Sequence, residues 1–233
     1  SNCTSMIQTF RYCDSFDSNL SKWDTNKMFS LQEAFRNAPL YNQPMNTQEV
    51  IHYGKTYNAW DVSNVNNFAI TFGGSVNIST TQSFNQDISN WNVSSGTNFS
   101  NMFTKCYHFN QDISNWNVSS GTNFYNMFYV AHKFNQDISN WNMSSATNLQ
   151  GMFVAAQAFN QPIGNWDVSN VTNMQETLYQ TTNFNQDIGD WDTGNVTSLY
   201  RFNQSGILDC DISSWDLSSV TNIESMFYKT TSF

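Results

Sequence analysis

The sequence has little charge, and most of what it has is negative. Only 12% of its 233 residues are charged, and nine Lys and Arg stand against 18 Asp and Glu, for a net charge of -9. Nucleic-acid binding needs clusters of Lys and Arg, so nucleic acid is not expected as a partner. An ordinary soluble domain carries about 25% charged residues. We therefore expect Asn, Ser, Thr and Gln to hydrate this surface.

Long apolar runs and catalytic motifs are also missing. No apolar segment approaches the ~20 residues of a transmembrane helix, so we expect no membrane insertion in this stretch. The sequence has three His, and it contains no nucleophile elbow, HExxH, P-loop or GxGxxG motif. We therefore predict that the protein is not an enzyme and uses no cofactor, with bound calcium as the one exception.

What the sequence does have is a repeat. The segment FNQDISNWNVS at residues 109–119 recurs, identical or nearly so, at 84–94, 134–144, 159–169 and 184–194. The tryptophans of these segments are 25 residues apart: Trp91, Trp116, Trp141, Trp166 and Trp191. A fixed period of this length indicates structural units that stack on one another. We predict that residues 1–233 form a single repeat solenoid of about eight repeats.

Two insertions interrupt the period, near residues 48–58 and near residues 73–78. The first lengthens the interval between Tyr41 and Trp60, and the second contains Gly73-Gly74-Ser75, a flexible turn. Insertions in repeat proteins form loops on one face, which is often the working face.

Within a repeat the apolar pattern changes. Apolar side chains fall at i, i+3, i+4 and i+7 in Phe99, Met102, Phe103 and Cys106, which is one face of a two-turn helix. The FNQDI and WNV pieces are too short for helices and hold aromatic and β-branched residues, as in strands. We therefore predict an α/β solenoid, a leucine-rich-repeat-like right-handed coil with one short parallel strand and one short helix in each 25-residue repeat. Thr97, Thr147 and Thr172 precede the predicted helices as N-cap candidates.

The combination of FNQDISNWNVSS with a following TNxxxMF resembles the BspA-like leucine-rich-repeat surface proteins. More narrowly, it is similar to their Trp-containing repeat of ~25 residues. The resemblance covers nearly the whole chain and is strongest from residue 84 to residue 191. It implies an extracellular, cell-surface protein linked to adhesion, and it transfers no catalytic residue.

Several residue types recur in columns, one per repeat. Each Trp is followed two residues later by an apolar residue on the same strand face, which favours a core column over a sugar-stacking platform. The Asn of each FNQ is interpreted as an internal amide ladder, with ligand binding as the alternative. This Asn column comprises Asn85, Asn110, Asn135, Asn160 and Asn185.

The acidic residues also form columns. Neighbouring strands in a stacked sheet lie ~4.8 Å apart. Like charges in successive repeats would repel one another at that distance, so either solvent screens them or a cation lies between them. Calcium would suit their oxygen ligands, although no EF-hand loop is present. The candidate metal ligands are Asp87, Asp112, Asp137, Asp167, Asp192 and Asp216.

The remaining candidate sites are sequons and cysteines. Sequons suit glycosylation in a secreted protein, although an Asn- and Ser-rich repeat also generates them by chance. The glycosylation candidates are Asn92, Asn117, Asn142, Asn170 and Asn195. Four cysteines show neither CxxC nor zinc spacing. Cys3 and Cys13 lie in one repeat and are a candidate disulfide. Cys106 stands where Ala131 and Ala156 stand in other repeats, which favours a buried thiol.

These observations predict an extracellular structural or adhesive repeat protein with a polar, acidic surface. Its expected partners are other surface or matrix proteins, glycans, or copies of itself. Head-to-tail self-association would join residues 1–16 of one copy to residues 226–233 of the next and could form filaments. The alternative for these ends is that the chain is a window from a longer array. The alternative function is a calcium- or carbohydrate-binding module that uses the stacked Asp and Asn columns.

Overall fold

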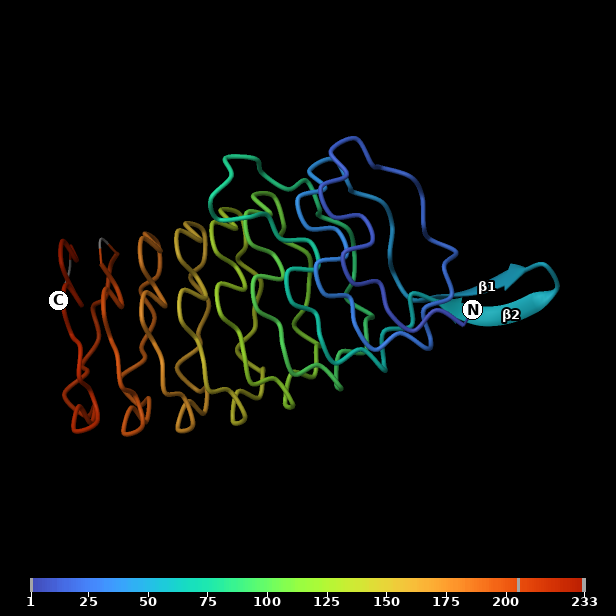
Figure 1. The fold of residues 1–233 in the computed structure, drawn as a ribbon. Helices are drawn as coiled ribbons and strands as arrows, with labels where there is room; N and C mark the ends of the chain where they lie inside the picture. Colours follow the sequence, from blue (N-terminus) through green and yellow to red (C-terminus); the bar gives the residue numbers. More distant parts are fainter. Residues whose placement is uncertain (1, 205, 232–233) are drawn as a thin grey trace.

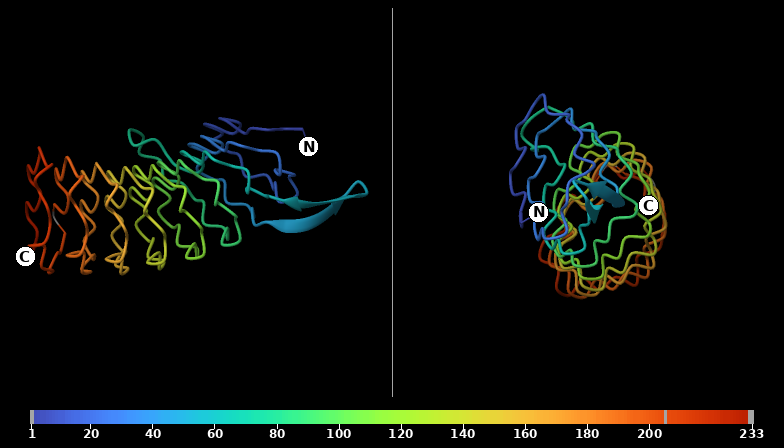
Figure 2. Two further views of the ribbon diagram at one scale, coloured as in Figure 1. Left: turned by 90° about the horizontal axis from the view of Figure 1, so that it is seen from below. Right: turned by 90° about the vertical axis from the view of Figure 1, so that its right-hand side faces the viewer.

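The repeats stack as rungs along one axis in the computed structural model, which describes residues 2–204 and 206–231 (Figure 1). We call one turn of the chain around this axis a rung. Isolated parallel bridges join the same position of successive rungs: Ser5, Ser30, Asn67, Asn98, Asn123, Asn148, Asn173, Ser198 and Asn222. The two views of Figure 2 show that the first rungs are displaced sideways from the regular stack that follows.

The segments predicted as helices are not helical. The N–H groups of Phe99, Asn101, Phe103 and Lys105 donate to carbonyls of the next rung, whereas those of Met102 and Thr104 donate to the carbonyl three residues before in the same rung. Asn101 (φ 54°) and Lys105 (φ 61°) are left-handed, so the chain turns sharply every fourth residue. The described residues contain no helix, and the predicted α/β solenoid with a strand and a helix in each repeat is therefore wrong.

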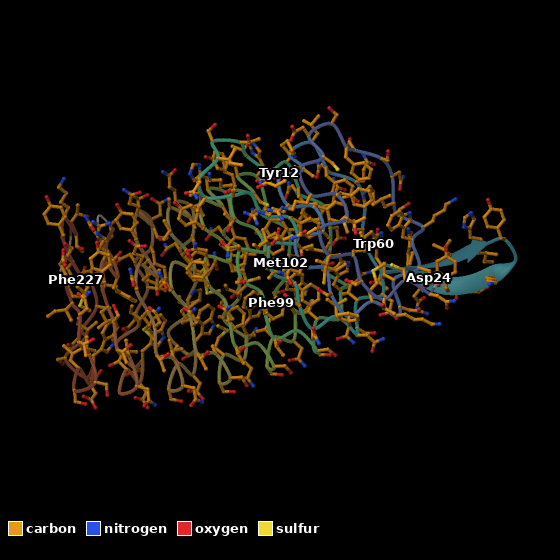
Figure 3. All side chains as sticks on the ribbon, in the orientation of Figure 1. Tyr12, Asp24, Trp60, Phe99, Met102 and Phe227 are labelled. Atoms are coloured by element: carbon orange, nitrogen blue, oxygen red, sulfur yellow. The ribbon has the colours of Figure 1, made fainter. Side chains whose placement is uncertain are left out.

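The side chains that were predicted to form the buried face of a helix are nevertheless buried. Phe99, Met102, Phe103 and Cys106 are all fully buried. A run of tight turns with a left-handed residue at every fourth position brings i, i+3, i+4 and i+7 to the same side, as a helix does. Figure 3 shows Phe99 and Met102 in the middle of the stack.

The predicted N-caps have a different role. The hydroxyl of Thr147 donates to the carbonyl oxygen of Thr122 (3.1 Å), and the hydroxyl of Thr122 donates to that of Thr97 (3.2 Å). Their backbone N–H groups donate to the same carbonyls. These threonines therefore join neighbouring rungs and do not begin helices.

Only two strands occur in the described residues, and both lie in the first insertion. β1 (Gln48–His52) pairs with β2 (Lys55–Ala59) in an antiparallel hairpin that projects from the first rungs (Figure 1). Tyr53 and Gly54 at its tip both have positive φ, as a two-residue hairpin turn requires. The first insertion is therefore a hairpin, whereas the parallel strands predicted at FNQDI and WNV are absent.

A lysine holds the second insertion in place. The ammonium group of Lys105 donates to the carbonyl oxygens of Ser75 (2.9 Å), Val76 (3.1 Å) and Ile78. Lys105 is buried apart from a small fraction of its surface, and burial lowers its pKa. The loop therefore closes over this side chain and supplies the acceptors that a buried charge needs.

Aromatic rings fill the interior in columns. Rings of one rung stack on those of the next at centroid distances of 5.4 Å for Phe99 and Phe124 and 6.5 Å for Trp116 and Trp141. Such pairs add about 0.5–1.5 kcal/mol beyond the burial of their area. The core is thus continuous along the stack.

Candidate functional surface

The Trp column belongs to the core, as predicted. The tryptophans of the regular rungs are buried, and each indole N–H donates to a carbonyl of the preceding rung. Trp141, for example, donates to Ile113 at 3.1 Å, and Trp166 donates to Ile138 at 3.1 Å. These rings are therefore not a platform for sugars.

The Asn column forms the predicted amide ladder, but the ladder lies at the surface and not inside the stack, because Asn110, Asn160 and Asn185 are exposed. The side-chain oxygen of Asn85 accepts the backbone N–H of Asn110 at 3.0 Å and the side-chain amide of Gln111 at 3.0 Å. The same arrangement continues at Asn135, which accepts from the backbone N–H of Asn160 at 2.9 Å. Because each amide oxygen serves the next rung, the column stabilises the stack.

The Asp columns lie on the surface. In each, the Oδ1 atom accepts the backbone N–H two residues later, as in Asp112 to Ser114 (2.9 Å) and Asp137 to Ser139 (2.9 Å). Asp87, Asp167, Asp192 and Asp216 follow the same rule. One oxygen of each carboxylate therefore stabilises a turn, and the other is left for solvent or a ligand.

The hydrogen bonds within these turns lower the pKa of several of the carboxylates. The hydroxyl and the backbone N–H of Ser114 hold the pKa of Asp112 below its usual value, and Ser169 does the same for Asp167. Serine lowers the pKa of Asp137 and Asp216 in the same way. Within the described ranges, no three His, Cys, Asp or Glu side chains come together as a metal site. Calcium binding by these columns stays a prediction.

All five sequon asparagines are exposed, but they fall into two groups. Asn170 and Asn195 use the amide nitrogen that would carry a glycan to donate to Ser144 (2.8 Å) and Ser169 (2.7 Å). Asn92, Asn117 and Asn142 instead use the amide oxygen to accept the N–H two residues later. The second group therefore suits modification better.

The two candidate disulfide cysteines contact their own segments. The Cys3 thiol lies 3.2 Å from the carbonyl oxygen of Ser5, and the Cys13 thiol lies 3.9 Å from that of Arg11. Their pairing stays a prediction. Cys106 is buried, as its column predicts, and its thiol donates to Phe72 at 3.6 Å.

The sequence patterns did not predict a cleft beside the hairpin. It has a volume of about 420 Å³ and is lined by Cys3, Lys22, Trp23, Asp24, Met28 and His52. Figure 3 places Asp24 at the base of the hairpin. The one hint of this cleft in the sequence was the irregular interval before Trp60. That interval showed that an insertion was present, but it did not show which segment the insertion would fold against.

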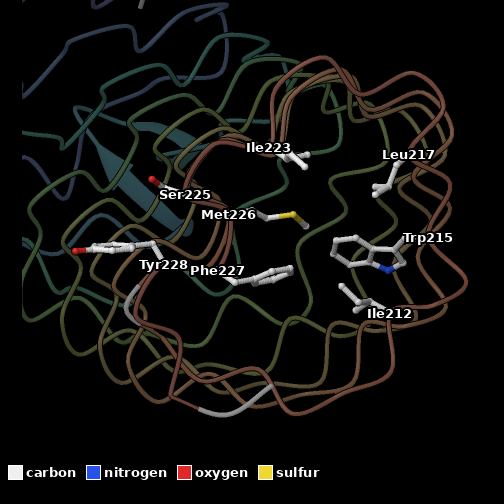
Figure 4. A pocket seen from close by; sticks show the side chains of 8 residues that line it. All are labelled: Ile212, Trp215, Leu217, Ile223, Ser225, Met226, Phe227 and Tyr228. Atoms are coloured by element: carbon white, nitrogen blue, oxygen red, sulfur yellow. The ribbon is translucent and has the colours of Figure 1, made fainter.

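A second hollow lies at the other end of the stack. It has a volume of about 470 Å³, and its lining includes Trp215, Leu217, Ile223, Met226 and Phe227 (Figure 4). These side chains occupy the inward positions of their rung. Ser1, Ser232 and Phe233, which belong to the two ends predicted to associate, lie outside the described residues.

In the described part of the chain, no helix is long and apolar enough to cross a bilayer. Comparison with curated proteins and with solved structures gave no match. The family model described as "Mycoplasma protein of unknown function, DUF285" matches residues 1–77, 48–164 and 147–233. Because these three matches together span the sequence, the chain belongs to the DUF285 family of repeat proteins.

Proposed function

We propose that the protein is an extracellular structural or adhesive protein, similar in function to the BspA-like surface proteins. Its partners are other surface or matrix proteins, glycans, or further copies of the chain. The observation that carries this proposal is the pair of exposed Asp columns, which repeat on successive rungs of a stack with a filled core. A stack of this kind presents the same binding groups many times, so a partner with several matching groups binds more tightly than one contact alone would allow.

The distribution of charge supports a partner with a basic surface. Residues 1–60 contain five Lys and Arg and five Asp and Glu, whereas residues 61–233 contain four and 13. The net negative charge therefore lies on the regular rungs, where it attracts positively charged groups and speeds their encounter.

Two measurements test the proposal. Antibodies against the purified protein should label intact cells of its source, and exclusive labelling after permeabilisation would contradict a surface role. Immobilised protein should also bind a lysine-rich polypeptide, and binding should weaken as salt rises because exposed charges are screened. The matched variant replaces Asp87, Asp112 and Asp137 by Asn, which keeps the turn acceptor and removes the charge. Undiminished binding by this variant would exclude the Asp column.

The alternative function, a calcium- or carbohydrate-binding module, makes a different prediction. A cation that binds the folded state raises the melting temperature, so its removal by EDTA should lower it. An unchanged melting temperature in EDTA and in millimolar calcium would exclude the calcium version.

Self-association is a second candidate, supported by the apolar hollow in Figure 4. At the opposite end the hairpin tip exposes Ile51 (74%) and Tyr53 (92%), which are apolar enough to enter such a hollow. The hollow belongs to the acidic part of the chain, whereas Lys55 lies beside the tip. Sedimentation at increasing concentration should then show growing assemblies, and Tyr53→Asp should reduce them. A monomer at every concentration would exclude this candidate.

A further inference from the structure

We propose that the cleft between the first rung and the β1–β2 hairpin binds the terminal sugar of a neutral glycan. Trp23, from the first rung, and His52, from the hairpin, both line this cleft. This inference rests on the proposed display function and assigns one specific binding site to it.

Trp23 differs from every other tryptophan in the chain. It is 36% exposed, whereas the others are at most 7% exposed. Within residues 2–204 and 206–231, its indole N–H has no protein acceptor, although each other indole N–H donates to a carbonyl of the preceding rung, as Trp60 does to Leu20 at 2.9 Å. Trp23 therefore offers both a ring face and a hydrogen-bond donor.

The hairpin is anchored to the segment that carries Trp23. The backbone N–H of Trp60 donates to the carbonyl oxygen of Trp23 (3.1 Å), and Asp24 forms an antiparallel bridge with Ala59. The hydroxyl of Tyr57 donates to the carbonyl oxygen of Lys22 at 2.5 Å. These contacts fix the hairpin beside Trp23, so the first insertion lies next to the one tryptophan that is exposed.

The size and chemistry of the cleft fit a sugar. The cleft of about 420 Å³ shares Lys22, Trp23 and His52 with a neighbouring hollow of about 320 Å³, which adds Asn19 and Ser21. Sites of 300–1,000 Å³ hold small ligands, usually through an apolar surface and a few polar groups that fix orientation.

A pyranose ring has one face of C–H groups and a rim of hydroxyls. Its C–H face would pack on the indole of Trp23, while the hydroxyls would meet the indole N–H, Ser21 and His52. The lining contains one Lys and one Asp, Lys22 and Asp24, whose charges are opposite. The lining therefore has no excess of one sign, which favours a neutral sugar over an acidic one.

The test uses the full chain and a panel of free oligosaccharides that end in galactose, glucose, mannose or N-acetylglucosamine. Titration calorimetry should find at least one that binds with Kd of about 1 mM or tighter, which corresponds to about -4 kcal/mol. Trp23→Ala should weaken this binding at least tenfold, and His52→Ala should weaken it severalfold. Tyr228→Ala, which removes an exposed aromatic ring at the other end of the stack, should leave it unchanged.

Three outcomes would overturn the inference. They are the failure of every oligosaccharide to bind at 10 mM, parent-like binding by His52→Ala, and tighter binding of a sialylated oligosaccharide than of its neutral counterpart. Thermal melting of each variant shows whether it is folded, and His52 is exposed on the hairpin, so its replacement tests the cleft even if Trp23→Ala is unstable. Labelling of intact cells is independent of these results. Surface labelling without sugar binding therefore rejects the cleft alone, and absence from the surface rejects the display function.

Discussion

The indole N–H of Trp116 donates to the carbonyl oxygen of Ile88, one rung earlier, at 3.1 Å. The ring of Trp116 also stacks on that of Trp91 with a centroid distance of 6.4 Å and an interplanar angle of 4°. A single side chain thus contributes apolar burial, ring stacking and a hydrogen bond to the joint between two rungs. Each regular rung is completed by its neighbour.

Trp116→Ala and Trp141→Ala are each expected to destabilise the protein by about 3–5 kcal/mol, because each empties a large core site. Trp116→Phe should cost less than Trp116→Ala, since a ring remains. It still removes one of the two hydrogen bonds that the Ile88 oxygen accepts, the other being that from the backbone N–H of Trp91 (3.1 Å). Urea denaturation measures all three. Trp23→Ala is the matched control and should cost far less because Trp23 is partly exposed. Equal costs at Trp23 and Trp116 would contradict the core role.

Val130→Asn is expected to stabilise the protein by about 1 kcal/mol. Val130 is left-handed (φ 58°), a conformation that is costly for a β-branched residue and cheaper for Asn. The backbone N–H of Val130 donates to the carbonyl oxygen of Val154 at 2.7 Å, and the substitution leaves this backbone group in place. Chemical denaturation provides the measurement, and a loss of stability would show that the Val130 side chain matters more than its backbone.

Gly151→Ala is expected to act in the opposite direction and to lower the melting temperature. Gly151 has φ 64°, and an added Cβ would lie 2.0 Å from Oδ1 of Asn126. The side chain of Asn126 must therefore move, and the left-handed backbone adds about 1 kcal/mol. A variant that melts with the parent would show that this joint is looser than its contacts indicate.

Cys106 should make stability fall above about pH 8.5. Burial raises the pKa of its thiol in the folded state, so the unfolded chain loses the proton first, and each pH unit then costs up to about 1.4 kcal/mol. Cys106→Ala should reduce this slope between pH 8.5 and 10, and the column tolerates Ala, as at Ala131 and Ala156. Burial also raises the pKa of Cys210, which is less buried and accounts for a smaller remaining slope. Burial also raises the pKa of Tyr41, which acts only at higher pH. Identical slopes with and without Cys106 would contradict the assignment.

Asp112 should stabilise the protein at neutral pH and lose this effect in acid. Its pKa in the folded state is lowered, so its contribution is present above the unfolded value of about 3.9 and disappears as the pH falls through the lower folded value. Asp112→Ala should lower the melting temperature at pH 7 more than Asp112→Asn, which keeps the acceptor for the Ser114 N–H. Below pH 3 the parent should lose its advantage over Asp112→Asn. A constant difference from pH 7 to pH 2 would contradict this role of the charge.

The inward residues were predictable, but the backbone that carries them was not. The spacing of Phe99, Met102, Phe103 and Cys106 correctly predicted a buried face, yet a helix and a run of turns give the same spacing. Asn101, Asn126 and Gly151 tolerate positive φ and were a signal for turns. Ile70, which stands in an earlier rung, and Val130, which stands in the rung of Asn126, also occupy left-handed positions and obscured that signal.

The candidate sites were predictable to different degrees. A strict period brings equal residues into columns, so the Trp, Asn and Asp columns followed from counting. The partner of each side chain did not, because Asp112 contacts Ser114 in its own turn and Trp116 contacts Ile88 one rung away. The cleft at Trp23 was not predicted, since it depends on where residues 48–59 fold back.

The sequence by itself determined the period of 25 residues and the identity of the core side chains, because apolar groups that recur at fixed positions must be buried whatever the backbone does. The tertiary structure decided the backbone conformation. A local pattern does not say whether the N–H of Phe99 meets a carbonyl of its own segment or, as observed, that of Asn123 on the next rung. It also decided which tryptophan is exposed, since Trp23 and Trp116 occupy the same position in their repeats and differ only in the rungs and the hairpin around them.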